Sequence, residues 1–155
     1  MSEPTPRDRT HHFILETFVE RGYAPHYTEI ARRFGVDPEE GKVLLRDLMS
    51  SGLPMWLYPG TDLIASVAPF NNQPTQYRLT VEGRQGWFGQ CGFESLAATW
   101  VFPGRAVQID APCLDCGEPI QVVVRDGVIE RHKPADVVGY IELPLARWAS
   151  DWPFT

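Results

Sequence analysis

One short stretch of the chain, residues 89–96, places a thiol and a carboxyl group three positions apart. Cys91 and Glu94 would share one face of a helix, because residues three apart are neighbours on a helical surface. With Cys91 in the first turn, the helix dipole and the free backbone N–H groups would favour the thiolate. A thiolate is a soft ligand that prefers soft metal ions. Glu94 is suited to carry a proton beside it, so the two residues form the candidate catalytic site.

These two side chains are the minimal parts for breaking a carbon–mercury bond. A thiolate holds the mercury and weakens the bond, and a thiol that binds mercury releases its proton. The neighbouring carboxylate can accept that proton and pass it to the leaving carbon. The alternative interpretation is that Cys91 is a small buried residue and Glu94 a surface residue, since a Cys-x-x-Glu pair is a weak motif by itself.

A second sulfur-bearing motif, Cys113-x-x-Cys116-Gly, has the shape of a zinc knuckle. A closed zinc site needs four ligands, and Cys91 and His132 are the candidates to complete it. A redox pair of this spacing would begin a helix, whereas the flanking proline and glycine indicate a turn between strands. Three interpretations stay open at this point: a structural or idle pair, a metal-binding pair that includes zinc as a possible ion, and a redox pair.

The first half of the chain is expected to be a small helical module. Residues 1–10 are polar and look disordered. Apolar spacing then predicts three helices, at 11–21, 27–34 and 38–49. The second and third helices are separated by a glycine turn, which is the helix-turn-helix pattern. Two short strands, 53–58 and 63–68, would add a wing, so residues 11–70 are predicted to be winged-helix-like.

The second half, residues 71–155, is expected to be a small sheet domain that carries the candidate catalytic site. A turn is predicted at 82–86, a helix at about 91–99, and a tight hairpin turn at Arg125-Asp126-Gly127-Val128, since Asp-Gly suits positive φ. Strands are predicted from alternation at 76–81, 106–110, 120–125, 127–130 and 137–142. The fold class is therefore α+β: a winged-helix-like helical module packed on a mixed or antiparallel sheet with one site-bearing helix.

Composition restricts the partners of this chain. The formal net charge of −6 argues against nucleic-acid binding, which needs a basic face. Glu39 and Glu40 also stand at the start of the predicted recognition helix, where they would face phosphate.

The sequence also indicates a compartment. No apolar run is long enough for a membrane span, and the polar N-terminus lacks a signal core. The cytosol is the expected compartment, and three cysteines there favour thiol or metal chemistry over disulfides.

The sequence resembles the alkylmercury lyase family. Residues 87–96 are similar to the family segment in which a cysteine and an acid stand three apart, 102–106 to the stretch that follows, and 113–120 to a cysteine-containing hairpin. The resemblance implies that an organomercurial is converted to a hydrocarbon and Hg(II), with Cys91 gripping mercury and Glu94 moving the proton. It implies no organic cofactor. The implied partners are a small organomercurial, low-molecular-weight thiols and a mercuric reductase, and the first cysteine of the hairpin would be structural.

Two departures from the family pattern stand out. The family's best-known members have Asp where this chain has Glu94, and their second catalytic cysteine follows the stretch similar to residues 138–144, near where this chain ends. We hypothesise that an in-frame UGA codon for selenocysteine was read as a stop, which sequencing beyond Thr155 would test. A second thiol or selenol would then come from that extension, or Cys113 or Cys116 would take its place.

Two alternatives to the lyase function stay open. One is a metal- or thiol-responsive binding protein, or a DNA-binding regulator, without turnover. The other is an inactive remnant.

Overall fold

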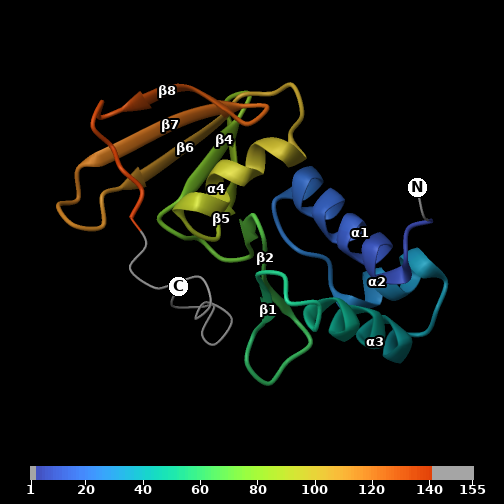
Figure 1. Ribbon diagram of the computed structural model, residues 1–155. Helices are drawn as coiled ribbons and strands as arrows, with labels where there is room; N and C mark the ends of the chain where they lie inside the picture. The colour runs from blue at the N-terminus through green and yellow to red at the C-terminus, as the bar shows by residue number, and fades with distance from the viewer. Residues whose placement is uncertain (1–2, 141–155) are drawn as a thin grey trace.

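The computed structural model describes residues 3–140, in which helices pack against one antiparallel sheet (Figure 1). The predicted α+β class is confirmed. The helices are α1 (Pro6–Arg21), α2 (Tyr27–Phe34), α3 (Pro38–Met49), α4 (Gly92–Ala97) and the 3₁₀ helix η1 (Ala98–Val101). The strands are β1 (Met55–Leu57), β2 (Ile64–Val67), β3 (Phe70–Asn71), β4 (Arg78–Val81), β5 (Arg84–Gly89), β6 (Val107–Pro112), β7 (Pro119–Arg125) and β8 (Val128–Lys133).

Helix α1 begins earlier than the sequence predicted. Residues 6–10 were expected to be disordered, but they form the first turn of α1, so that prediction was wrong. The reason is a capping box: the Thr5 hydroxyl accepts from the backbone N–H of Asp8 at 3.2 Å, and the Asp8 carboxylate accepts from the backbone N–H of Thr5 at 2.8 Å. Pro6 occupies the first helical position, where a proline is tolerated because no N–H is needed.

Helices α2 and α3 form where the helix-turn-helix spacing predicted them. Gly35 closes α2 with a left-handed φ of 68°, and Asp37 caps α3 by accepting from the backbone N–H of Glu40 at 3.0 Å. Gly41 is required by packing, since a Cβ there would lie 2.6 Å from the Tyr27 carbonyl oxygen. Strands β1 and β2 form the expected antiparallel hairpin after α3. The winged-helix designation of this unit stays a prediction.

The sheet continues from the helical half of the chain into the second half. Its strand order is β1-β2-β3-β5-β4-β6-β7-β8, and a single core cluster spans both halves. The ring of Phe18 in α1 stacks on Phe70 at 5.1 Å between centroids, and the Trp87 indole N–H donates to the Phe18 carbonyl at 2.6 Å. The Asn72 side-chain oxygen accepts from the Ala24 N–H at 2.8 Å. Whether the two predicted domains fold separately stays a prediction.

Three details of the second half differ from the sequence prediction. The turn expected over 82–86 is confined to Glu82 and Gly83, and the following residues form strand β5, whose two glycines weakened the strand signal. The helix predicted at about 91–99 is shorter and continues as η1. Residues 137–140 do not form the predicted strand, and the rest of that prediction, 141–142, lies outside the described residues. The Asp126-Gly127 turn is confirmed, with φ of 48° and 81°.

The strand register decides which residues meet at the site. Arg78, the first residue of β4, pairs with Phe88 near the end of β5 and with Asp110 near the end of β6. The segments that follow β5 and β6 therefore leave the sheet at the same end (Figure 1). Separately, none of the helices within residues 3–140 is long and apolar enough to cross a membrane.

Candidate functional site

Cys91 is the N-cap residue of α4, just before the first turn in which the sequence analysis expected it. Its backbone is extended, with φ −149° and ψ −179°, and its Sγ accepts from the backbone N–H of Glu94 at 3.4 Å. Both residues are half-buried. The cap geometry thus brings the thiol to the backbone N–H of Glu94, the residue that carries the carboxyl group.

Hydroxyl groups that the sequence analysis missed hold this cysteine in place. The buried Ser95 hydroxyl donates to the Cys91 carbonyl at 2.6 Å. The Thr75 hydroxyl donates to the carbonyl of Gly89 at 2.7 Å, and the Gly89 N–H donates to the Tyr77 carbonyl at 2.8 Å. A Cβ on Gly89 would overlap the Ser95 Oγ. A serine four residues after Cys91 was the available signal, since such hydroxyls commonly bond the i−4 carbonyl.

Gln90 links the cysteine loop to the residues that directly precede β1 and β3. Its backbone N–H donates to the Pro69 carbonyl at 3.0 Å, and its side-chain Nε2 donates to the Pro54 carbonyl at 3.3 Å. Its Oε1 is buried without a hydrogen-bond partner among residues 3–140. A buried amide oxygen of this kind is costly to leave unpaired, so it marks a polar position directly beside Cys91.

Burial governs the protonation of the two candidate catalytic groups. It raises the pKa of the Cys91 thiol, and this effect exceeds the lowering by the N–H groups of Glu94 and Phe93. The expectation that the helix start would favour the thiolate is therefore wrong for the free protein, because a six-residue helix does not offset desolvation. Burial also raises the pKa of the Glu94 carboxyl. Both shifts favour the protonated forms, so the pair is suited to hold and deliver protons.

Aromatic side chains border the start of α4. A Cβ on Gly92 would lie 3.5 Å from the Tyr77 ring, and one on Gly139 would lie 2.6 Å from the Phe93 ring. The backbone of Gly139 therefore passes against Phe93, which keeps 46% of its surface exposed. The start of α4 therefore has a thiol and a carboxyl group with the rings of Tyr77 and Phe93 nearby, the types of group that interact with a ligand carrying one soft atom and one apolar group.

Cys113 and Cys116 lie in the turn that joins β6 to β7. The Cys113 N–H donates to the Glu118 carbonyl at 2.8 Å, and the Gly117 N–H donates to the Cys113 carbonyl at 3.0 Å. This confirms the predicted turn between strands, so the helix-start arrangement that the redox interpretation needed is not formed. Backbone N–H groups of Cys116 and Asp115, together with the Cys116 thiol, lower the pKa of Cys113.

The structure does not bring the two cysteine sites into one metal cluster. Among residues 3–140, no three His, Cys, Asp or Glu side chains gather closely enough to hold a metal ion. His132, the candidate fourth zinc ligand, has its Nδ1 3.1 Å from the Pro134 carbonyl oxygen instead. Zinc at Cys113 and Cys116 stays a prediction, with two ligands present where a closed site needs four.

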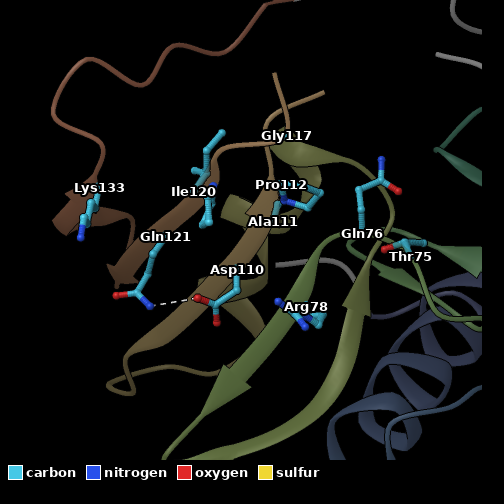
Figure 2. Close-up of a pocket in the computed structure, with 11 residues that line it drawn as sticks. Thr75, Gln76, Arg78, Asp110, Ala111, Pro112, Gly117, Ile120, Gln121 and Lys133 are labelled. Carbon is cyan, nitrogen blue, oxygen red and sulfur yellow. Dashed lines mark hydrogen bonds between the residues drawn. The ribbon is translucent and has the colours of Figure 1, made fainter. Parts of the chain in front are cut away.

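A pocket of about 690 Å³ lies on the sheet beside the β6–β7 turn (Figure 2). The Asp110 carboxylate in it accepts from the side-chain amides of Gln121 at 2.9 Å and Gln108 at 2.8 Å. Arg78 lines the same wall, and Gly117 borders the pocket next to the cysteine turn. Cys91 and Glu94 do not line it. Sequence reasoning missed this group because only the register of β4, β6 and β7 brings these polar residues together.

Comparison with known proteins identifies relatives of the second half of the chain. The family model of alkylmercury lyase (MerB) matches residues 70–152, more than half of the chain. Alkylmercury lyases of Bacillus cereus and Clostridium butyricum are each 35% identical over 74 residues, which are 46% of this chain and 32% of each relative. The matched part thus spans about a third of those proteins.

The fold is similar to that of a solved structure. A crystal structure of the mercury-bound form of MerB2 superposes with a TM-score of 0.60 and 21% identity, covering 82% of this chain and 61% of that one. At this level of identity the likeness concerns the fold. It extends over more of the chain than the sequence matches do, which means that part of the helical half is included.

Proposed function

Since the chain belongs to the alkylmercury lyase family, we propose that it cleaves the carbon–mercury bond of a small organomercurial, giving a hydrocarbon and Hg(II). The observation that carries the proposal is the hydrogen bond of the Cys91 Sγ to the Glu94 N–H within the family-matched stretch. It places a soft ligand and a proton carrier on one turn. No other described segment combines a thiol with a carboxyl group whose pKa is raised by burial.

The reaction begins with thiol exchange at mercury. A substrate R–Hg–SR′, in which R′S is a small thiolate, meets the Cys91 thiol. The sulfur of Cys91 bonds to mercury, the bond to R′S breaks, and the Cys91 proton leaves with it as R′SH. The raised pKa of Cys91 means that this step exchanges a proton for mercury, because a metal-bound thiol is deprotonated.

Protonolysis follows at Glu94. The protonated carboxyl gives its proton to the carbon, and the electron pair of the C–Hg bond becomes the new C–H bond. R–H departs, and Hg(II) stays on the Cys91 sulfur beside the Glu94 carboxylate. Burial raises the pKa of Glu94 and so keeps a larger share of it protonated before this step. The longer Glu side chain, compared with Asp in the best-known family members, would act through altered geometry.

A second thiolate on mercury would increase the electron density on the leaving carbon and assist this step. Low-molecular-weight thiols from solution can supply it. Cys113 and Cys116 are the other thiols among the described residues. The same small thiols, or a mercuric reductase, would remove the product Hg(II). The cytosolic, reducing compartment expected from the sequence would provide such thiols.

The test is turnover of phenylmercury or methylmercury in excess small thiol, with benzene or methane measured by gas chromatography. We expect the wild-type protein to release hydrocarbon and the Cys91→Ser variant to release none above the protein-free background. A melting curve of each protein checks that both are folded. Stoichiometric mercury binding without hydrocarbon from the wild type would contradict the lyase proposal and support the alternative of a metal-responsive binding protein.

A further inference from the structure

The two sulfur-bearing segments leave the sheet at the same end. Cys91 follows the end of β5 and Cys113 follows the end of β6, with only β4 between these strands in the sheet. Adjacent strands are about 4.8 Å apart, so the ends of β5 and β6 are separated by about 10 Å. The pairing of Arg78 with both Phe88 and Asp110 confirms that these ends are level (Figure 1).

The cysteine turn presents two thiols on one short loop. Cys116 is exposed and Cys113 is partly exposed, and both are free. The loop is closed by the backbone bonds from Cys113 to Glu118 and from Gly117 to Cys113, and Gly117 has the positive φ of 75° that this closure needs. The pocket described above borders this loop at Gly117 (Figure 2).

We propose that Cys113 and Cys116 form a second soft-metal site that binds one Hg(II) through both sulfurs and receives the ion released at Cys91. The source of the ion rests on the proposed function, whereas the binding itself does not. Two thiolates without a third His, Cys, Asp or Glu among residues 3–140 suit an ion that is satisfied by two soft ligands. Zinc needs four, so the ligand count favours mercury over zinc.

Transfer occurs by thiol exchange. The mercury held by Cys91 has first taken a small thiolate from solution as its second ligand. In the first exchange a sulfur of the turn bonds to this mercury, and the proton of the incoming thiol passes to the departing Cys91 sulfur. In the second, the other thiol of the turn displaces a small thiolate from mercury and gives that thiolate its proton. Each exchange forms one S–Hg bond, breaks one S–Hg bond and moves one proton, with no change of oxidation state.

The pair holds mercury more firmly than separate thiols because its second bond is intramolecular. Once one sulfur of the turn is bound, the other is present at an effective concentration in the millimolar range or above. A monothiol in solution has to compete with both bonds. The turn would therefore retain Hg(II) under conditions in which a single cysteine releases it.

The experiment measures Hg(II) retention in variants that lack Cys91. The probe is mercuric chloride added with excess glutathione, followed by desalting and determination of mercury per protein, together with the ultraviolet sulfur-to-mercury absorption. Cys91→Ser is compared with the doubly substituted Cys91→Ser/Cys113→Ser and Cys91→Ser/Cys116→Ser, each of which leaves one thiol. We expect one equivalent in the first protein and at least a tenfold weaker retention in the other two, since they lose the chelate.

Two results would overturn the dithiol site: no retention by Cys91→Ser, or full retention by either doubly substituted protein. Hydrocarbon release by the wild type is measured separately. If no hydrocarbon appears while Cys91→Ser keeps its mercury, the lyase proposal fails and the dithiol site stands. If hydrocarbon appears while Cys91→Ser keeps none, the dithiol site fails and the lyase proposal stands.

Discussion

The Sγ of Cys91 accepts a hydrogen bond from the backbone N–H of Glu94 at 3.4 Å, which makes the cysteine the cap of α4. A cap residue has a fixed backbone direction, because its side chain satisfies an N–H group that the helix leaves free. The thiol is therefore oriented before any mercury arrives.

Removal of the Glu94 proton should slow hydrocarbon release while leaving mercury binding intact. We expect Glu94→Gln to lower the rate about 100-fold or more, the usual contribution of a general acid, with Hg(II) still bound at Cys91. Because burial disfavours the charged carboxylate, the same variant should also melt at a higher temperature at neutral pH. Turnover and thermal unfolding measure the two effects.

Matched variants distinguish the loss of the Glu94 acid from the loss of a carboxyl group elsewhere on the protein. Glu94→Asp should keep more activity than Glu94→Gln, since it retains an acid. Glu16→Gln, on the exposed face of α1, should match the wild type. An active Glu94→Gln protein would show that the proton reaches carbon from another donor.

The pH dependence of the alkylation rate should differ between Cys91 and Cys113. Burial raises the pKa of Cys91 from 9.0, whereas N–H groups of its own turn lower that of Cys113. Because the thiolate reacts, iodoacetamide should label Cys113 at lower pH than Cys91, whose rate should still increase above pH 9. Mass spectrometry of digests taken over a pH series gives both profiles within one protein. Labelling of Cys91 ahead of Cys113 would be inconsistent with a buried, protonated thiol.

A methyl group at Gly89 should displace the loop that carries Cys91 without changing either candidate catalytic side chain. The Cβ of Gly89→Ala would overlap the Ser95 Oγ, which holds the Cys91 carbonyl. Overpacking of this kind costs about 1–3 kcal/mol, and we expect both stability and turnover to fall. The double variant Gly89→Ala/Ser95→Ala, which removes the overlapping oxygen, should recover part of the stability. No loss in the single variant would mean that the loop adapts freely.

The ion pair between Arg21 and Glu29 should contribute to acid stability. Two bonds of 2.8 Å to Arg21 lower the pKa of Glu29 from 4.5 to about 2. A lowered folded-state pKa gives stability that is complete above about pH 4.5 and is lost as the pH falls toward 2. With side chains 27% and 32% exposed, Glu29→Gln should cost roughly 1–2 kcal/mol at pH 7 after solvent screening.

Denaturant unfolding at pH 7 and at pH 3 measures this contribution. The difference between wild type and Glu29→Gln should be smaller at pH 3, where part of the Glu29 stabilisation has been lost. Asp47→Asn, which breaks the more exposed pair with Arg7, should change stability little at either pH. A difference that is equal at both pH values would indicate that the pair does not act through the Glu29 charge.

Local spacing predicted the elements that depend on local signals. The α2–turn–α3 unit, the Asp126-Gly127 hairpin and the Cys-x-x-Glu turn all follow from residues within a few positions of one another. The sequence did not indicate β5, because its glycines obscure the alternation, although Gly89 is needed for the approach of Ser95. It also missed the pairing of Arg78 with Asp110, which depends on register between distant segments.

For a related reason, the protonation state of Cys91 could not be predicted from the residues that neighbour it in the sequence. The start of a helix favours a thiolate, and only the packing around residue 91 reveals that desolvation outweighs that effect. In the proposed mechanism this protonated thiol exchanges its proton for mercury, and Glu94 donates its own proton to carbon.

The most direct measurement is single-turnover release of benzene from phenylmercury by wild type and Cys91→Ser in excess small thiol. We expect about one equivalent of benzene from the wild type and none above background from the variant. Equal release by both proteins would contradict it, because carbon–mercury cleavage would then proceed without the Cys91 sulfur.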